Sequence, residues 1–174
     1  MYRAGVVGLH IGLHHVRGYT HSEATELVAI ADVDAALLDE VGRSCGVPSR
    51  HLSLSDMLER EALDIVSVCT PVQLHAPMVI AAAEAGVRAV LCEKPITPDM
   101  GSAAAIASAC NTNDVKLVIG YMRRQLPQFH RARELIADGA IGNTLEKFAP
   151  RGMVAPAETG NDSAAFFLGD LHVG

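Results

Sequence analysis

The chain has 174 residues, of which 49% are hydrophobic and only 4% aromatic, and its formal net charge at pH 7 is −6. This length can bury a full core, which in the absence of Trp must consist mostly of Ala, Val, Leu and Ile. The negative charge gives no general attraction to nucleic acid or anionic lipid, and no run reaches the roughly 20 apolar residues of a membrane span, so we expect neither partner.

Apolar runs alternate with helical patterns up to Gly120. The predicted strands are residues 3–9, 26–32, 64–69, 89–92 and 116–120, with a minor strand at 48–52. The predicted helices are residues 12–21, 34–46, 53–60, 72–85 and 98–111. We expect Asp34, Ser53 and Thr97 to cap three of these helices. Strands that alternate with helices predict an α/β fold built on a doubly wound parallel sheet of the Rossmann type.

The pattern changes after Gly120. Residues 126–137 have the pattern of an amphipathic helix, and residues 143–149 that of a strand. We therefore predict a dinucleotide-binding domain over residues 1–120 and the start of a second α/β domain over residues 121–174.

The four cysteines form no CxxC pair and have no metal-like spacing. Cys69 and Cys92 close apolar runs, where a thiol behaves as a small hydrophobic group. The first residues have the pattern of a strand and not of a signal peptide. We expect a cytoplasmic protein with reduced cysteines and no metal site.

A glycine-containing segment, Gly8-Leu9-His10-Ile11-Gly12, joins the first predicted strand to the first helix. Glycines at this position let backbone amides approach a pyrophosphate at the helix N-terminus. His10 stands where the usual fingerprint has its middle glycine, and it either holds the cofactor slightly away or donates to a phosphate oxygen. Gly8, His10, Ile11 and Gly12 are therefore candidate cofactor-binding residues, although a purely structural turn explains the segment equally well.

Asp32 ends the second predicted strand, about 20 residues after Gly12. A carboxylate at this position accepts hydrogen bonds from the adenine ribose hydroxyls and repels a 2′-phosphate. Asp32 thus favours NAD, with NADP a poorer cofactor. The alternative role is that of an ordinary helix cap, for which Asp34 is the better candidate.

Two further segments follow strands at the carboxyl edge of the predicted sheet, where ligands of open parallel sheets bind. Thr70 and Pro71 follow the third main strand, and His75 lies in the first turn of the next helix as either a structural residue or a cofactor neighbour. Lys94 follows the strand at 89–92. A lysine held there, with Glu93 as its orienting partner, can handle the proton of a substrate hydroxyl during hydride transfer.

In this order, these segments resemble the Gfo/Idh/MocA family of NAD(P)-dependent oxidoreductases, the glucose-fructose oxidoreductase and inositol dehydrogenase group. The resembling segments are GVVGLHIGLHH at 5–15, VAIADVD at 28–34, VSVCTPVQLH at 66–75, AGVRAVLCEKPI at 85–96 and GYMRRQLPQFHRARELI at 120–136. The resemblance implies that Lys94 is catalytic and that the Lys94–Pro95 peptide bond can be cis. Arg124, from the last segment, is a further cofactor-binding candidate.

The same resemblance implies a second domain with a large open sheet, on which substrate binds and subunits often pair. We expect this chain to contain only the start of that domain, and to form a homo-oligomer only when the sheet is present. Family enzymes usually carry Asp-x-x-x-His in the first helix of the second domain, whereas Asp170 and His172 have a different spacing. If Asp170 is the family aspartate, Gly174 stands at the histidine position. We favour His172 as the acid/base partner, which places Leu168 at the aspartate position.

The leading hypothesis is an NAD-dependent oxidoreductase that transfers a hydride between nicotinamide and a secondary alcohol of a sugar, polyol or cyclitol. One alternative is a non-catalytic NAD-binding sensor or regulatory module. Another is a Rossmann-type methyltransferase, since glycine turns and an acidic strand end also serve S-adenosylmethionine. Glu93, Lys94 and Pro95 have no role in the methyltransferase reading, which therefore ranks last.

Overall fold

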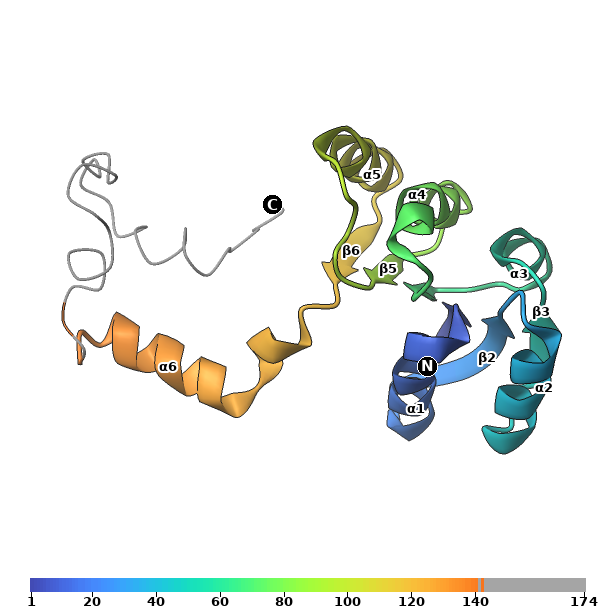
Figure 1. Ribbon diagram of the computed structural model, residues 1–174, viewed down its shortest axis with the longest axis horizontal. Coiled ribbons are helices and arrows are strands. Elements are labelled where there is room, and N and C mark those ends of the chain that lie inside the picture. The colour runs from blue at the N-terminus through green and yellow to red at the C-terminus, as the bar shows by residue number, and fades with distance from the viewer. Residues whose placement is uncertain (141, 143–174) are drawn as a thin grey trace. The chain divides into compact units, whose positions relative to one another are not determined.

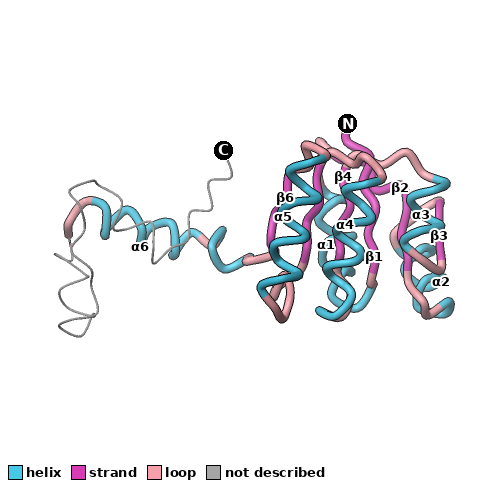
Figure 2. The backbone as a smooth tube through the Cα atoms, turned by 90° about the horizontal axis from the view of Figure 1, so that it is seen from above, coloured by secondary structure: helices cyan, strands magenta, loops and turns pink. Residues whose placement is uncertain are grey.

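Parallel strands form a single sheet at the centre of the first part of the chain, in a computed structural model that describes residues 1–140 and 142. The chain divides into two compact units, 1–121 and 122–174. The strands are β1 (Tyr2–Val7), β2 (Thr25–Ala31), β3 (Ser49–His51), β4 (Ile65–Val68), β5 (Ala89–Cys92) and β6 (Lys116–Ile119). Their order is β3-β2-β1-β4-β5-β6 with every neighbouring pair parallel. Figure 2 shows the strands in magenta from above, with β3 and β6 toward opposite ends of the sheet. The predicted doubly wound sheet is confirmed.

Helices cover both faces of this sheet, as Figure 1 shows. They are α1 (Leu9–His21), α2 (Ala35–Ser44), α3 (Leu54–Arg60), α4 (His75–Glu84) and α5 (Met100–Thr112). Successive strand residues point to opposite faces. Val6 accordingly packs in the core cluster under α1 and α2, whereas Val7 packs in the cluster under α3, α4 and α5. Strands buried on both faces explain why the strand segments are apolar throughout instead of alternating.

Two of the three predicted helix caps are confirmed and one is wrong. The Asp34 carboxylate accepts from the backbone N–H groups of Ala36 and Leu37 at 2.9 and 3.1 Å, and the Ser53 hydroxyl accepts from the N–H of Asp56 at 3.1 Å. Thr97 does not cap α5, because that helix begins later.

The residue that caps α5 is Asp99, whose carboxylate accepts from the N–H of Ser102 at 2.8 Å. Thr97 instead contacts Asp99 through its hydroxyl, at 3.4 Å. Asp is at least as good an N-cap as Thr, and Asp99 lies two residues closer to the free N–H groups that begin the helix. The helix therefore starts at Met100 and not at Pro98.

Two other helix starts differ from the predicted ones. The α1 helix begins directly after Gly8, so Leu9, His10 and Ile11 are helical. Residues Val72–Leu74 form a 3-10 turn (η1), and α4 begins only at His75. Pro77 has no N–H with which to close an α-helical bond to residue 73, and it is tolerated only in the first turn.

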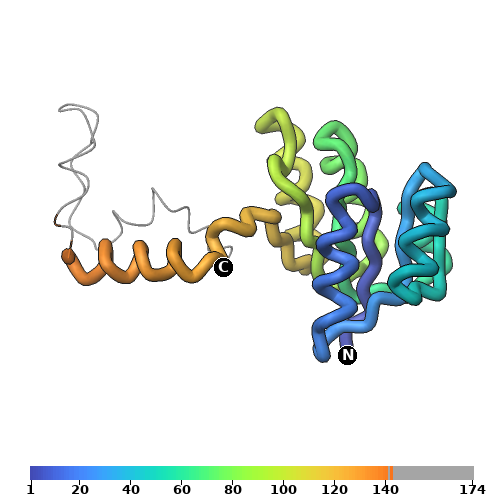
Figure 3. The backbone as a smooth tube through the Cα atoms, turned by 60° about the horizontal axis from the view of Figure 1, so that its bottom comes forward, coloured from blue at the N-terminus to red at the C-terminus, as the bar shows by residue number. Residues whose placement is uncertain are grey.

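The second unit, considered by itself, begins with a 3-10 turn, η2 (Met122–Gln125), followed by α6 (Pro127–Ala137). Pro127 occupies the first helical turn, where its missing N–H costs nothing. The helix predicted over 126–137 is confirmed, and Figure 3 shows it as one uninterrupted helix in orange. The strand predicted at 143–149 lies outside the described residues. In the described part of the chain, no helix has the length and apolar character needed to cross a membrane.

Candidate functional site

A groove of about 640 Å³ runs along the carboxyl edge of the sheet. It falls in the range of roughly 300–1,000 Å³ that is usual for small-molecule sites. It is lined by Val7, Gly8, His10, Ile11, Asp32, Val33, Asp34, Leu52, Ser53, Leu54, Cys69, Thr70, Pro71, Leu74, Met78, Glu93 and Lys94. Because the chain leaves β1 and β4 toward opposite faces, the groove lies at the crevice where parallel sheets bind ligands.

The turn after β1 depends on Gly8. Its φ is +86°, and a Cβ atom placed there would lie 2.7 Å from the carbonyl carbon and oxygen of Cys69. Its N–H donates to the carbonyl oxygen of Ala31 at 2.9 Å. Only glycine allows the loops after β1 and β4 to approach this closely, which leaves backbone in place of a side chain at the floor of the groove.

The first turn of α1 presents unpaired backbone donors to the groove. The first N–H groups of a helix have no intrahelical acceptor, and this helix has no acidic residue in its first turn. The N–H of Leu9 donates to Asp32, and the next two belong to His10 and Ile11, whose exposed side chains line the groove. Such a helix end binds anions.

His10 replaces a glycine without backbone strain. Among the described residues other than glycine, a positive φ occurs only at Asp114. His10 is the second residue of α1, and its ordinary helical conformation needs no glycine. The departure from the usual fingerprint therefore changes the side chain at the groove and leaves the turn itself intact.

Asp32 joins the end of β2 to the turn after β1. Its Oδ2 accepts from the N–H of Leu9 at 2.7 Å and its Oδ1 from the N–H of Asp34 at 2.9 Å. The residue is 9% exposed and lines the groove. Each carboxylate oxygen has a second lone pair, so Asp32 is held in one orientation and can still accept hydrogen bonds from a ligand.

Two of the predicted residues do not line the groove. Gly12 lies on the buried face of α1, where a Cβ would come within 2.9 Å of Val6 Cγ1 and 3.3 Å of Cys69 Cβ. The lack of a Cβ therefore lets the helix pack close to the sheet. His75 is 1% exposed, with Nδ1 2.9 Å from the carbonyl oxygen of Pro95 and Nε2 2.8 Å from that of Thr70. His75 therefore connects the loops that follow β4 and β5.

Lys94 lines the groove with an exposed side chain, and Glu93 is buried beside it. The Oε2 of Glu93 accepts from the backbone N–H of Lys94 at 3.1 Å. The Lys94–Pro95 peptide bond is cis, as the resemblance implied. Thr70 and Pro71 line the groove from the neighbouring strand end, so the loops after β4 and β5 meet there as predicted.

The surroundings of the cysteines near the groove make their thiols unreactive. Burial, followed by the negative charge of Glu93, raises the pKa of the Cys92 thiol to about 12. The same two causes raise the pKa of Cys69 as well. Both thiols are protonated at neutral pH and act as small apolar groups, which agrees with their interpretation from the sequence.

Three polar residues that the sequence analysis did not single out form a series of hydrogen bonds that ends at Glu93. His15 and Tyr19 come from one face of α1, and Ser67 is a fully buried hydroxyl inside β4. The sequence offered one signal for this group, since Ser67 is a polar residue within the otherwise apolar run Ile65–Val68. Its partners lie 48 and 52 residues away in the sequence, however, so spacing alone could not have found them.

Two further candidates lie outside the first unit. Arg124 lies in η2 of the second unit, and His172 lies outside the described residues. Within residues 1–140 and 142, no three His, Cys, Asp or Glu side chains are grouped so as to hold a metal ion.

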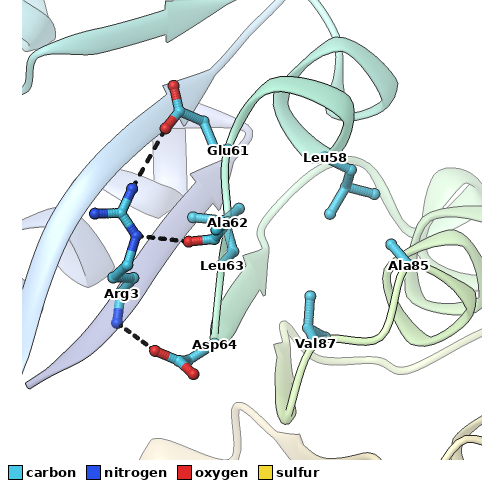
Figure 4. Close-up of a pocket in the computed structure, with 8 residues that line it drawn as sticks. All are labelled: Arg3, Leu58, Glu61, Ala62, Leu63, Asp64, Ala85 and Val87. Carbon is cyan, nitrogen blue, oxygen red and sulfur yellow. Dashed lines mark hydrogen bonds and ion pairs between the residues drawn. The ribbon is translucent and has the colours of Figure 1, made fainter.

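A second cavity, of about 320 Å³, lies at the amino edge of the sheet (Figure 4). The Arg3 guanidinium donates to the carbonyl oxygen of Ala62 at 2.6 Å and pairs with Glu61 at 3.6 Å, while the backbone N–H of Arg3 donates to Asp64 at 2.9 Å. The charged groups of this cavity are already paired with one another, so it has a structural explanation.

Comparison with known proteins agrees with this geometry. Residues 2–121 match the Gfo/Idh/MocA family, described as an oxidoreductase family with an NAD-binding Rossmann fold. The chain belongs to the Gfo/Idh/MocA oxidoreductase family.

The names of similar family members describe enzymes that act on sugars and inositols. Inositol 2-dehydrogenase of Rhizobium meliloti is 34% identical over 142 residues, which are 80% of this chain and 42% of that protein. D-xylose 1-dehydrogenase (NADP(+)) 2 of Haloferax volcanii is 35% identical over 143 residues, which are 81% of this chain and 44% of that protein.

A solved structure shows the same fold. The scyllo-inositol dehydrogenase of Lactobacillus casei, crystallised with NAD(H) and scyllo-inositol, has a TM-score of 0.78 and 27% identity, covering 82% of this chain and 43% of that one. The chain thus spans less than half the length of these Gfo/Idh/MocA proteins.

Proposed function

We propose that residues 1–121 bind NAD and serve a dehydrogenase that acts on a secondary alcohol of a sugar, polyol or cyclitol. One observation carries the proposal: a single groove unites the bare N-terminus of α1, the carboxylate of Asp32 and the side chain of Lys94. Along the sheet edge, Asp32 follows β2, the start of α1 follows β1 and Lys94 follows β5. In this order the groups suit the adenine ribose, the pyrophosphate and the reacting end of a dinucleotide. The names of similar family members supply the substrate class.

The nucleotide half of the groove would be held by groups with fixed positions. The N–H groups of His10 and Ile11 would donate to the pyrophosphate, and the His10 side chain adds a further donor. Asp32 would accept from the ribose hydroxyls. A 2′-phosphate would bring negative charge next to both Asp32 and Asp34, so NAD is the expected cofactor.

At the other end of the groove, Lys94 would exchange a proton with the substrate hydroxyl. NAD, when bound, supplies the hydride acceptor. His172 would be the second acid/base group, and Arg124 a further residue in contact with the cofactor. Neither role has support in the described geometry, and both rest on the sequence.

The first test is calorimetric titration of the folded chain with NAD, NADP and S-adenosylmethionine. We expect NAD to bind at least about tenfold more tightly than NADP, because of the two carboxylates at the ribose end. Asp32→Ala should remove most of this preference, whereas Asp39→Ala, an exposed carboxylate on α2 that pairs with Arg50, should not. Binding of S-adenosylmethionine alone, or of none of the three ligands, would contradict the proposal.

The catalytic part of the proposal is tested by Lys94→Ala. Reduction of NAD is followed by absorbance with a panel of inositols and sugars, and Lys116→Ala at the opposite end of a strand is the control. We expect Lys94→Ala to abolish turnover while NAD affinity changes by less than about threefold. Both measurements use a protein that also carries the substrate domain. Binding of NAD without turnover by that protein, unmodified, would instead favour the alternative of an NAD-binding sensor.

A further inference from the structure

A chain of partly buried hydrogen bonds leads from Tyr19 to Lys94. The Tyr19 hydroxyl lies 2.8 Å from Ser67 Oγ, which lies 3.1 Å from His15 Nδ1. His15 Nε2 lies 3.2 Å from Glu93 Oε1, and these two side chains are 7% and 8% exposed. The other oxygen of Glu93 accepts from the N–H of Lys94 at 3.1 Å.

We propose that His15 is a positioning residue that fixes the Glu93 carboxylate and, through it, the backbone of Lys94. This inference rests on the proposed role of Lys94 and extends it to groups that touch neither cofactor nor substrate. His15, Ser67 and Tyr19 do not line the groove, so they act only through Glu93.

One arrangement of hydrogens matches every donor of this chain with an acceptor. A neutral His15 with its hydrogen on Nε2 donates to Glu93 and accepts at Nδ1 from the Ser67 hydroxyl. Ser67 in turn accepts from Tyr19, whose phenol is protonated because burial raises its pKa. If His15 also carried a hydrogen on Nδ1, the two lone pairs of Ser67 Oγ could accept from both His15 and Tyr19, and the bond from Nε2 to Glu93 would remain.

The Glu93 carboxylate has few other ways to obtain hydrogen-bond donors. A buried carboxylate is costly unless it accepts hydrogen bonds, and its two donors here are the ring of His15 and the N–H of Lys94. On a third side lies Gly120, where even an added Cβ would come within 2.9 Å of Oε1. Loss of the His15 donor should therefore turn or neutralise the carboxylate and release the Lys94 backbone.

A matched pair of variants separates positioning from simple loss of packing. The side-chain amide of His15→Gln can place a donor near the position of Nε2, whereas that of His15→Asn reaches only as far as Nδ1. The variant His14→Asn, at the exposed neighbouring position of α1, controls for helix propensity. All are made in the 174-residue chain, and circular dichroism confirms that each is folded.

The main readout is hydrogen exchange of the Lys94 amide, measured by NMR. We expect His15→Asn to accelerate it at least tenfold, and His15→Gln to stay within about threefold of the unmodified chain. NAD affinity should change by less than about threefold in both variants, because position 15 does not line the groove. Where turnover is measured, kcat should fall in His15→Asn with KM for NAD unchanged.

Several outcomes would overturn the inference. One is an unchanged rate of hydrogen exchange at the Lys94 amide in folded His15→Asn. Another is an equal acceleration of that exchange in the Asn and Gln variants, which would indicate that only the packing of His15 matters. If the variants do not fold, the nitrogen spectrum of His15 in the unmodified chain decides, since a hydrogen on Nδ1 instead of Nε2 contradicts the arrangement. Failure of the unmodified chain to bind NAD would refute the proposed function while leaving the Lys94 exchange result intact.

Discussion

Gly8 shows how a single residue determines the shape of the groove. Its positive φ and its contact with the backbone of Cys69 are both incompatible with a side chain. Gly18, in the α1 helix that follows Gly8, has open space around the position of its missing Cβ. The two glycines therefore differ in what an added methyl group would meet, and they form a natural pair for a test.

We predict that Gly8→Ala lowers the free energy of unfolding by at least about 2 kcal/mol, because it adds backbone strain and a collision with main-chain atoms. Gly18→Ala should raise that free energy by up to about 1 kcal/mol, since alanine is the better helix former. Urea unfolding measures both. Equal effects of the two substitutions would show that the turn after β1 tolerates a side chain.

A second prediction at this scale concerns Asp56, whose pKa is lowered by its hydrogen bond from His51 and then by that from Arg60. A carboxyl group with a lowered pKa in the folded state stabilises the fold above its unfolded pKa of about 4, and this contribution is lost as pH falls through the folded value. Asp56→Asn should therefore flatten the decrease of the melting temperature between pH 6 and pH 3. Asp39→Asn serves as the control, and an unchanged pH profile for Asp56→Asn would contradict the assignment.

The residues that the sequence identified share one property: their role follows from a linear motif. Gly8, Asp32 and Lys94 each follow a strand at a recognisable distance, so topology alone brings them to one edge. The role of His15 depends on Glu93, 78 residues away. No short-range pattern marks such a pair, because a histidine on a helix face is ordinarily a surface or packing residue.

At the level of the elements, the order of strands and helices was predictable and their ends were less so. Alternating apolar strands and helices specify a parallel sheet with little ambiguity. The starts of α4 and α5 were placed too early, because Pro77 and Asp99 compete with the signals that precede them. When two nearby residues can both start a helix, the backbone geometry decides between them, and a pattern of residue propensities does not contain that geometry.

The corrected start of α5 leads to a prediction. Asp99→Ala should lower the urea midpoint clearly more than Thr97→Ala, because only Asp99 accepts from a backbone N–H at the start of the helix. The lowered pKa of Asp99, caused chiefly by its bond to the Ser102 N–H, points to the same interaction. A larger effect of Thr97→Ala would restore Thr97 as the cap.

In the first unit as a whole, the two faces of the sheet carry separate cores. The cluster under α3, α4 and α5 is the larger, and Ile106 of α5 lies within it at 1% exposure. Ile106→Ala should cost about 2–5 kcal/mol of unfolding free energy through lost burial and a cavity. Val118→Ala on β6, at 54% exposure, should cost less than about 0.5 kcal/mol. Similar losses would show that Val118 is covered in solution.

The strand order has a consequence for how such a domain diversifies. The carboxylate that would select between nucleotides belongs to the β2 side of the crevice, and the lysine belongs to the β5 side, on segments that do not share a loop. Substitutions in the segment that carries the carboxylate can accumulate without disturbing the segment that carries the lysine. A lineage that keeps its chemistry could therefore exchange its nucleotide preference by replacing only the stretch from β2 to β3, a graft that experiment can imitate.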